Sequence, residues 1–265
     1  NKIMNSPRGS IWRKWDLHIH TPKTKKNNQY RLEEKDGDVW DEFCKKIEES
    51  DVAVFGITDY FSADNYFTFV GKFKDKYPDS QKQFFPNIEL CSSYVVNKAQ
   101  EEVNIHLLFN TRIENLEQKI KTFLQNLKTN KTVGEGRYIT ASELSNQSDY
   151  EEATTTREFI EAALKETFGN KADLLNYLLI FTAANNDGIR TETEKLNGKV
   201  RGKKKKATIT DELDKFSDGF FGNSGNIEYF LNENRLEGKE EKIKPKPVVT
   251  GSDAHSFSQL DEWLG

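Results

Sequence analysis

Two histidines separated by one residue, His18 and His20, are the strongest chemical signal in the sequence. In an extended strand alternate side chains point to the same side, so both imidazoles would face one point in space. Imidazole nitrogens that converge in this way are typical metal ligands. A second pair of possible ligands with the same spacing, Asp253 and His255, occurs near the end of the chain. The two pairs together predict a metal site.

Two further candidate ligands lie within apolar segments. Glu89 stands between Ile88 and Leu90, where burial of a carboxylate is costly unless a partner or a metal ion compensates for it. His106 lies in the largely apolar run 103–109. A single histidine in such a run is more often a core residue bonded to a backbone carbonyl. Because all four histidines of the chain occur in or after strand-like runs, we count His106 among the candidate ligands.

The donor set defines the chemistry to expect. Imidazole and carboxylate together suit zinc, manganese or iron, and they disfavour a site for magnesium alone. A carboxylate can bridge two such ions, and a bridged water becomes hydroxide near neutral pH. Metal-bound hydroxide is a nucleophile for the hydrolysis of phosphoesters. Mechanisms that use an activated Ser or Cys lack support, because the chain contains neither a nucleophile elbow nor a Walker-type phosphate loop.

Six strand-like segments, which alternate largely with helices, must position these ligands. Strands are predicted at 15–21, 51–58, 84–90, 103–109, 177–183 and 248–250. Helices are predicted at 39–50, from Ser62 or Asp64 to before Pro78, and at 113–127, 159–168 and 227–231. The candidate ligands fall at or near the C-terminal ends of the strands, which form one face of a parallel α/β barrel. The residues expected to converge there are His18, His20, Glu89, His106, Asp253 and His255.

The composition predicts one large domain with a polar surface. Of the 265 residues, 31% are charged and 35% are hydrophobic, and the mean hydropathy is -0.79. We expect a single domain over 1–265, with polar insertions near 129–156 and 190–210. The chain lacks an apolar run of about 18 residues and a signal-peptide pattern, which predicts a cytoplasmic protein without membrane contact. Cys44 and Cys91 form no metal motif, and we expect reduced thiols.

A net charge of -4 means that any contact with a polyanion must be local. Lysines directly follow the histidine pair in a predicted loop, where they could meet a phosphate group or form only a solvated surface. The run 199–206 holds six basic residues in eight and predicts a flexible surface loop, which could also attract nucleic acid. The candidate phosphate-binding residues are Lys23, Lys25, Lys26 and Arg190.

The motifs and their order resemble the PHP (polymerase and histidinol phosphatase) domain over nearly the whole chain. That family has an opening His-x-His strand, a Thr-Asp-His strand end, an isolated Glu, an isolated His, a later His after an apolar strand and a terminal Asp-x-His. The resemblance implies a distorted, TIM-like (β/α)7 barrel with up to three metal ions at the C-terminal ends of the strands. Residues 15–22 and 251–255 further resemble the PHP domains fused to large ATPases in bacterial anti-phage defence proteins of the TrlF and Ppl kind. A C-terminal ATPase region is then expected beyond 263–265.

The resemblance also implies roles for single residues. The positions of the first family metal are occupied by His18, His20, Glu89 and Asp253. A second metal would use Glu89 and His106, but Asn185 stands where the family has a further histidine. A third would use His255, and Tyr60 replaces another histidine. Amide and phenol are poorer ligands than imidazole, so we expect one firm site and weaker second and third sites. Tyr60 could instead donate a hydrogen bond to a phosphate oxygen.

The donor set and the resemblance together predict a metal-dependent phosphoesterase. The finer expectation is a nuclease that cleaves DNA as the effector domain of an ATPase-coupled anti-phage defence protein, with manganese or zinc, or alternatively iron, as the cofactor. The expected partners are DNA, the ATPase region of the same polypeptide and further copies assembled through that region. Two alternatives stay open. One is a small-molecule phosphatase of the histidinol-phosphatase type, and the other is a degenerate, non-catalytic PHP module that binds nucleic acid or supports assembly.

Overall fold

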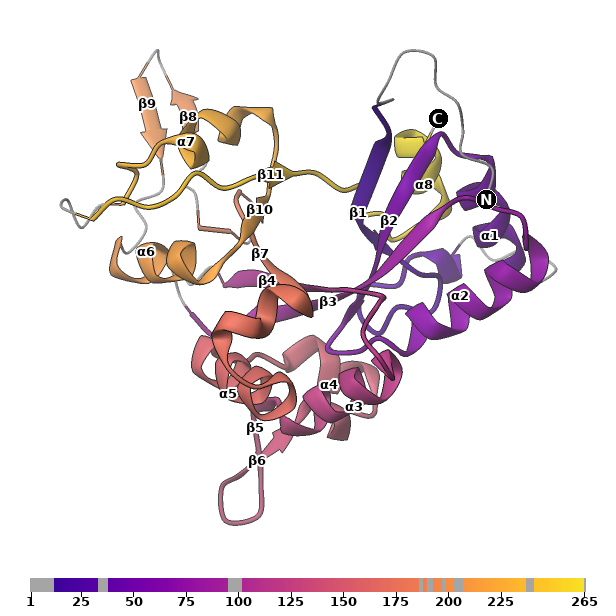
Figure 1. Ribbon diagram of the computed structural model, residues 1–265, viewed down its shortest axis with the longest axis horizontal. Coiled ribbons are helices and arrows are strands. Elements are labelled where there is room, and N and C mark those ends of the chain that lie inside the picture. Colours follow the sequence, from indigo (N-terminus) through magenta and orange to yellow (C-terminus); the bar gives the residue numbers. More distant parts are fainter. Residues whose placement is uncertain are drawn as a thin grey trace.

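A curved seven-stranded sheet forms the centre of the protein (Figure 1). The computed structural model describes residues 12–32, 38–94, 102–185, 188–189, 193–196, 199–202, 207–236 and 241–264. The strands, in their order across the sheet, are β1 (Lys14–His20), β2 (Val52–Tyr60), β3 (Gln83–Ser92), β4 (Val103–Phe109), β7 (Leu178–Ala183), β10 (Gly219–Phe221) and β11 (Val248–Val249). The predicted α/β barrel is confirmed, and all six predicted strands are present.

Two features of the sheet were not predicted. Strand β10 is only three residues long, and its sequence Gly-Phe-Phe is too short to show a periodic pattern. Strand β4 runs antiparallel to both of its neighbours, β3 and β7, whereas the other adjacent strands of the sheet pair in parallel. The barrel is therefore parallel except at β4, so β4 presents its N-terminal half to the face where β3 and β7 present their C-terminal ends.

The barrel is nearly closed by the segment that follows β11. Ala254 forms a parallel bridge with Ile19 of β1, and the backbone N–H of His20 donates to the Ala254 carbonyl at 3.2 Å. The N–H of Asp253 donates to the carbonyl of His18 at 2.8 Å. The last strand segment therefore lies beside the first, and the residues near both ends of the chain become neighbours.

Helices cover the outside of the sheet in two groups (Figure 1). The first group, beside β1 and β2, is α1 (Val39–Glu49), α2 (Asp64–Lys76) and α8 (Phe257–Leu264). The second group, beside the remaining strands, includes α3 (Leu116–Asn126), α5 (Arg157–Phe168), α6 (Ala207–Phe216) and α7 (Ile227–Leu231). The predicted helices are confirmed, and α5 ends at Gly169, whose φ of 90° suits glycine. Within the described ranges, no helix has the length and apolar character needed to cross a bilayer.

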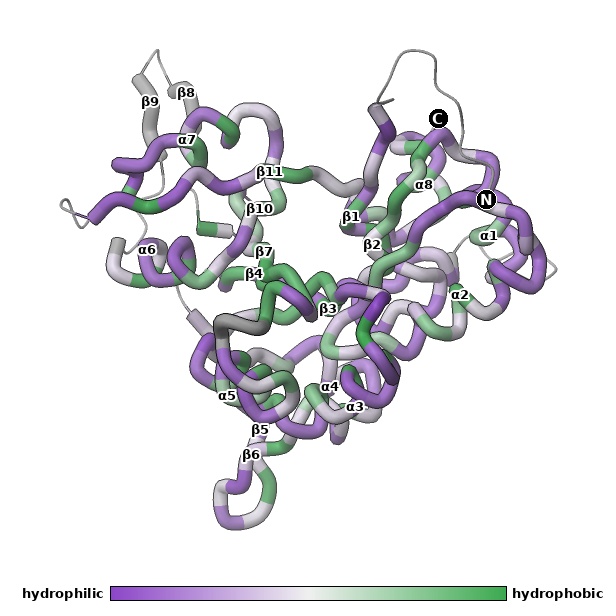
Figure 2. Tube along the Cα trace, viewed as in Figure 1, coloured by the Kyte–Doolittle hydropathy of each residue, from purple (hydrophilic) through white to green (hydrophobic). Residues whose placement is uncertain are grey.

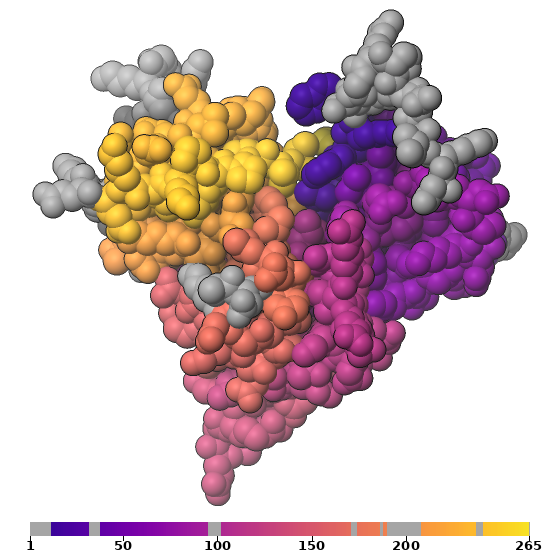
Figure 3. Space-filling view, in the orientation of Figure 1, coloured from indigo at the N-terminus to yellow at the C-terminus, as the bar shows by residue number. Residues whose placement is uncertain are grey.

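The polar insertions contain more regular structure than predicted. The stretch 132–156 was expected to be a loop with a short helical piece near 142–144. It instead belongs to a region with the hairpin β5 (Lys128–Val133) and β6 (Arg137–Thr140) and the helix α4 (Gln147–Glu152), and a 3-10 turn stands at the expected helical piece. The hairpin projects from the body of the molecule (Figure 3). In the second insertion β8 (Thr193–Leu196) pairs with β9 (Lys199–Gly202), so the first half of the predicted basic loop is a strand. Residues 203–206 lie outside the described part. Short 3-10 turns are η1 (Tyr30–Leu32), η2 (Ala141–Glu143), η3 (Lys171–Asn176) and η4 (Ser224–Asn226).

Alternation along the strands separates the barrel interior from the helix-covered face. In β2, Phe55 and Ile57 pack among the helices of the first group, whereas Val54 belongs to an interior cluster with Leu17 and Phe181. Figure 2 shows apolar residues concentrated on the central strands and polar residues on the outer helices and the hairpin. The barrel interior is therefore lined by apolar side chains at one end and by polar side chains at the other.

A buried ion pair holds the last part of the chain in place. Arg235, whose side chain is fully buried, donates through Nε and Nη2 to both carboxylate oxygens of Asp214 at 2.8 and 2.9 Å. It also donates to the carbonyls of Phe230, Asn232 and Lys244. This guanidinium joins α6 to α7, to the residue that follows α7 and to the approach to β11. We infer that it fixes the position from which the chain returns to β1.

Replacing Arg235 by methionine should lower the free energy of unfolding by about 3 to 5 kcal/mol, because Asp214 would remain buried without its main partner. The decrease in the free energy of unfolding should lie near the lower end of this range, because Nζ of Lys246 remains 3.3 Å from the carboxylate of Asp214. Urea unfolding measures the change. Lys121→Ala is the control, because it removes only an exposed pair with Glu117 and should lower the free energy of unfolding far less. Equal losses in the two variants would contradict a structural role for Arg235.

Candidate metal centre

Four predicted ligands meet at the polar end of the barrel. The Nε2 atoms of His18 and His20 lie 3.1 Å apart. Oε2 of Glu89 is 3.2 Å from each of these nitrogens. Oδ1 of Asp253 is 3.1 Å from Nε2 of His18 and 3.5 Å from Nε2 of His20. The two imidazoles and two carboxylates predicted for the first metal therefore point at one small volume.

A bulge in β1 brings the histidine pair into the barrel. The register between β1 and β2 shifts between Asp16 and Ile19, so Leu17 and His18 both reach the interior although they are adjacent. Oδ1 of the buried Asp16 accepts from the N–H of His18 at 3.2 Å and from the N–H of Ser252 at 3.0 Å. Asp16 thus links the bulge to the segment that closes the barrel.

Glu89 and His106 come from paired positions on antiparallel strands. The two residues lie opposite each other in the β3–β4 ladder. Glu89 is 2% exposed, and its Oε1 accepts from Nδ2 of Asn104 at 2.7 Å while Oε2 faces the histidine pair. The ring of His106 lies with its centroid 4.5 Å from that of His18. Pairing across β3 and β4 therefore brings His106 to the centre although it lies in the middle of its strand.

Asp253 reaches the centre from a strained backbone conformation. Its φ of 51° lies in the left-handed region, which aspartate tolerates better than most residues. Its side chain is 59% exposed, in contrast to the buried Glu89. The hydrogen bond from its N–H to the carbonyl of His18 holds it beside β1. The carboxylate of Asp253 therefore forms the open side of the centre.

A hydrogen-bonded chain behind His20 fixes its orientation. Nδ1 of His20 donates to Oγ1 of Thr24 at 3.2 Å, and this hydroxyl donates to Oδ1 of Asp59 at 3.1 Å. Asp59 also accepts from the N–H groups of Lys25 and Tyr60 and from the amide of Asn65. The arrangement leaves Nε2 of His20 directed at the other ligands, as outer partners of metal-binding histidines typically do.

The charges of the centre are interdependent. Burial opposes protonation of His20, but hydrogen bonds to the carboxylates of Asp253 and Glu89 outweigh it and raise the pKa of His20 to about 9. Burial also opposes ionisation of Glu89, yet the neighbouring His18 and His106 hold its pKa well below the usual value. Burial lowers the pKa of His106 to about 3, so His106 is neutral at pH 7. Without a metal ion, a proton on His20 offsets part of the negative charge of the two carboxylates.

The donor set fits a divalent ion. Two groups of donors in the described residues have ligand atoms within 4.8 Å of one another. One group is His18, His20 and Asp253, and the other is His18, Glu89 and His106. The buried Nδ1 of His106 has no hydrogen-bond partner, which leaves a polar atom of the centre uncompensated. Imidazole and carboxylate donors of this kind suit zinc, manganese or iron.

Tyr60 and His255 bond to each other beside this centre. Nδ1 of His255 donates to the carbonyl of Asp253 at 2.8 Å, so its Nε2 is the acceptor for the hydroxyl of Tyr60 at 3.1 Å. The ring of His255 stacks on His20 with a centroid separation of 4.0 Å. Burial, reinforced by His20, lowers the pKa of His255 to about 4. Both nitrogens of His255 are therefore occupied, and the predicted ligand supports His20 by stacking.

The side chain of Asn185 is also hydrogen-bonded to a neighbouring residue. Its amide exchanges two hydrogen bonds of 2.9 Å with the amide of Asn226, and Oδ1 of Asn226 also accepts from the N–H of Asn223. Asn185 lines a cavity of about 270 Å³ that also borders His18 and His106. It lies at the wall of the predicted site with its oxygen already bonded to a neighbour.

The predicted phosphate-binding lysines occupy different surroundings. Nζ of Lys26 lies 5.4 Å from the centroid of the Tyr60 ring and 3.6 Å from Sγ of Cys91, so Lys26 is next to the centre. Lys25 lies beside Asp64, with 3.9 Å between Nζ and the carboxylate, and Lys23 is exposed. Arg190 lies outside the described residues. Of the three lysines, Lys26 is therefore the one with a contact to Tyr60 beside the metal centre.

Sequence reasoning missed the residues that position the ligands. Thr24, Asp59 and Asn104 each bond to a ligand or to its partner, and Asn226 holds Asn185. The run Thr-Asp at 58–59, where buried β2 ends, was a usable signal for Asp59. Thr24 and Asn226 lie in segments without periodicity, so no pattern marks them.

Comparison with solved structures shows a distant structural likeness. No protein-family profile and no curated protein matches the chain. A crystal structure from Bifidobacterium adolescentis, of a protein provisionally described as a metal-dependent phosphoesterase, is similar with a TM-score of 0.40 and 11% sequence identity. The similarity covers 93% of this chain and 89% of that chain. Roles of single residues do not transfer at this distance, so they follow from the geometry of the centre.

Gly251→Ala should weaken metal binding by about 10- to 100-fold, the range for changes that misplace a ligand through its surroundings. A Cβ at this position would lie 2.4 Å from Cβ of His18 and 2.7 Å from its backbone nitrogen, so His18 would have to move. Competition with a chelating dye measures the affinity. Gly71→Ala is the control, because a Cβ there meets nothing within 4 Å, and it should stabilise α2 by about 0.5 to 1 kcal/mol. Wild-type affinity in Gly251→Ala would contradict the assigned position of His18.

Metal binding should strengthen as the pH rises from about 6 to about 9. Below a pKa of about 9, His20 carries a proton on the metal-free protein, and a metal ion must displace that proton to bind Nε2. The gain should be about tenfold per pH unit for each proton released. Calorimetric titration with Zn²⁺ in buffers of different ionisation enthalpy measures the release directly. A pH-independent affinity without proton release would show that His20 is not a ligand.

Proposed function

We propose that the protein is a metal-dependent phosphoesterase. The single observation that carries this proposal is the convergence of His18, His20, Glu89 and Asp253 within 3.5 Å contacts at the open end of the barrel. A divalent ion held there would act as a Lewis acid and lower the pKa of a coordinated water. The residues of the chain supply the rest, namely ligand orientation, charge balance and substrate contacts.

The surroundings of the centre support binding of a phosphoester. Asp253 lies on the open side, so a substrate can approach from there, while the buried Glu89 anchors the opposite side. Lys26 is placed next to Tyr60, where its ammonium could pair with a phosphate oxygen. The hydroxyl of Tyr60 already donates to His255, so it can contact a phosphate only if that bond is given up. We therefore assign phosphate binding to Lys26 before Tyr60.

The number of metal ions should be small. His18 belongs to both groups of donors, so the two groups compete for one imidazole. The partners of His255 and Asn185 occupy the atoms that further ions would need. We propose one firmly bound ion, with a second only when a substrate supplies additional oxygen ligands.

We propose DNA as the substrate and a role as the nuclease effector of an ATPase-coupled defence protein. The support is the sequence resemblance and the position of Lys26 next to the centre. A small phosphomonoester is the second candidate, and the observation in its favour is the size of the adjoining cavity. Its volume of about 270 Å³ is below the range of about 300 to 1,000 Å³ typical of ligand pockets. A compact phosphate group fits such a cavity better than a duplex does.

Replacing His18 and His20 together by alanine should abolish metal-dependent hydrolysis. The loss should exceed about a hundredfold, since even outer partners of a metal ligand change activity by about 10- to 100-fold. The assay uses single- and double-stranded DNA and p-nitrophenyl phosphate, each with manganese, zinc or magnesium, together with metal analysis of the purified protein. Tyr138→Ala, on the projecting hairpin, is the control and should retain wild-type rates.

The substrate that the protein hydrolyses distinguishes the candidate functions. Cleavage of DNA that disappears in the double variant supports the nuclease, whereas activity on p-nitrophenyl phosphate alone supports the small-molecule phosphatase. Unchanged activity in the double variant would overturn the metal-dependent assignment. A protein that binds DNA equally well with and without the two histidines and hydrolyses neither substrate would be the non-catalytic module.

A further inference from the structure

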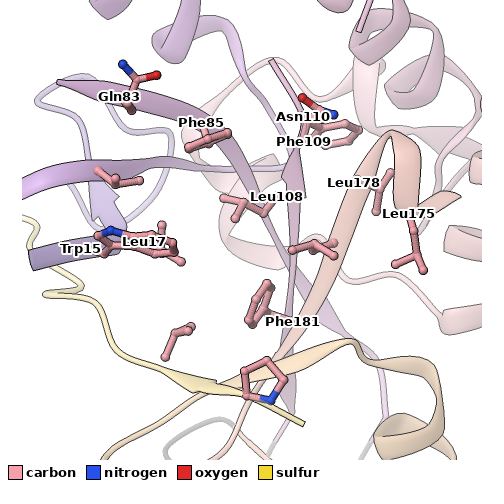
Figure 4. Close-up of a pocket in the computed structure, with 14 residues that line it drawn as sticks. Trp15, Leu17, Gln83, Phe85, Leu108, Phe109, Asn110, Leu175, Leu178 and Phe181 are labelled. Atoms are coloured by element: carbon pink, nitrogen blue, oxygen red, sulfur yellow. The ribbon is translucent and has the colours of Figure 1, made fainter. Parts of the chain in front are cut away.

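We propose that a cavity at the base of the barrel binds an uncharged, largely apolar small molecule. The cavity has a volume of about 540 Å³ and lies at the end of the barrel away from the metal centre. Figure 4 shows Trp15 and Leu17 on one side of it, Leu175 and Leu178 on the other, and Leu108 between them. This site is independent of the proposed phosphoesterase chemistry.

The cavity is formed by interior positions of the strands. Leu17 reaches it because the bulge in β1 turns this residue inward together with His18. Phe85 lies four residues before Glu89 on β3, and Leu108 lies two residues after His106 on β4, so both face the same interior nearer its base. Leu179 of β7 contributes from the facing side. Six of the seven strands thus surround one open space.

The size of the cavity fits a small organic molecule. Ligand pockets typically measure about 300 to 1,000 Å³. A dry apolar cavity of about 150 Å³ already binds benzene, so the present space can hold a considerably longer aliphatic or aromatic body. Side chains that face an empty cavity lack dispersion contacts on that side, and an apolar ligand would supply them. The rim residues Trp15 and Leu179 are 54% and 38% exposed, which leaves the cavity accessible from solvent.

The lining selects an uncharged ligand. Fourteen described residues line the cavity, and none of them carries a charge. The polar side chains among them are Gln83 and Asn110. The amide of Asn110 already bonds to the carbonyl of Asn176 and the N–H of Arg112. Gln83 makes only a weak 3.5 Å contact with the carbonyl of Gln81, so it can turn to a hydroxyl or carbonyl of a ligand. A carboxylate would find no cation in this lining.

An apolar layer separates this cavity from the metal centre. The layer consists of Leu17, Leu108, Phe181 and Phe221. The centroids of the Phe181 and Phe221 rings are 5.4 Å apart, and Phe221 lies 4.6 Å from His106 on its other side. A molecule in the basal cavity therefore cannot reach the metal ligands. It would be a bound effector or structural ligand rather than the substrate of the centre.

The test uses the full chain and the neutral fluorescent probe N-phenyl-1-naphthylamine. Saturable binding with energy transfer from tryptophan is expected, because Trp15 lies at the rim. Leu179→Trp fills the mouth and should weaken binding at least tenfold. Ile227→Trp, at a similarly exposed position on α7, is the matched control and should bind as the wild type does. A Trp15→Phe variant should lose part of the energy transfer, since three other tryptophans remain, while its probe affinity, read from direct excitation, is unchanged.

Competition identifies the ligand class. Decanol should displace the probe and raise the thermal midpoint of unfolding, whereas decanoate should do so at least tenfold less effectively. Absence of saturable probe binding, equal binding by Leu179→Trp, or better competition by decanoate would each overturn the proposal. So would dimerisation in analytical ultracentrifugation that Leu179→Trp abolishes, because a second copy of the chain would then cover the cavity. Circular dichroism and the thermal midpoint confirm that each variant is folded.

Discussion

The hydrogen bonds between β1 and the segment after β11 are the constraint on which the centre depends. Asp253 donates to the carbonyl of His18, and His20 donates to the carbonyl of Ala254. These two bonds close the barrel and, in the same step, bring the first pair of ligands beside the last. The absence of space for a Cβ at Gly251 shows how closely the two segments approach. Closing the barrel and assembling the metal ligands are therefore one structural event.

Burial of charge explains why these ligands need a cation. Two carboxylates, Glu89 and Asp253, share a volume with imidazoles that burial alone would keep neutral. In the metal-free protein, a proton on His20 supplies positive charge, and the neighbouring carboxylates also raise the pKa of His18 against the effect of burial. A divalent ion held there would displace the proton of His20 and use the same lone pair, which would relieve both the carboxylate repulsion and the cost of charging a buried ring.

Sequence patterns predicted the strands, which show as apolar or alternating runs, and the carboxylate that is costly to bury. They did not predict strand direction, the bulge or the loop residues that position the ligands. Period-two alternation and apolar runs located six strands, and the buried Glu89 was found because an unpaired carboxylate is expensive. The direction of β4 is not encoded in its alternation, because a strand reads the same in either direction. The bulge that turns Leu17 and His18 inward depends on where β1 meets β2. Thr24 and Asn226 act from loops, where only the fold reveals their partners.

The departures from the expected three-metal pattern are structurally consistent with one another. Where the pattern has a histidine, Tyr60 donates a hydrogen bond to His255, and this bond uses the nitrogen that a cation would otherwise take. Asn185 is likewise satisfied by the reciprocal amide pair with Asn226. In both places a hydrogen bond between neighbouring neutral groups occupies the atom that a further ion would need. Metal binding therefore depends mainly on His18 and His20, and a second ion would need further ligands from a bound substrate.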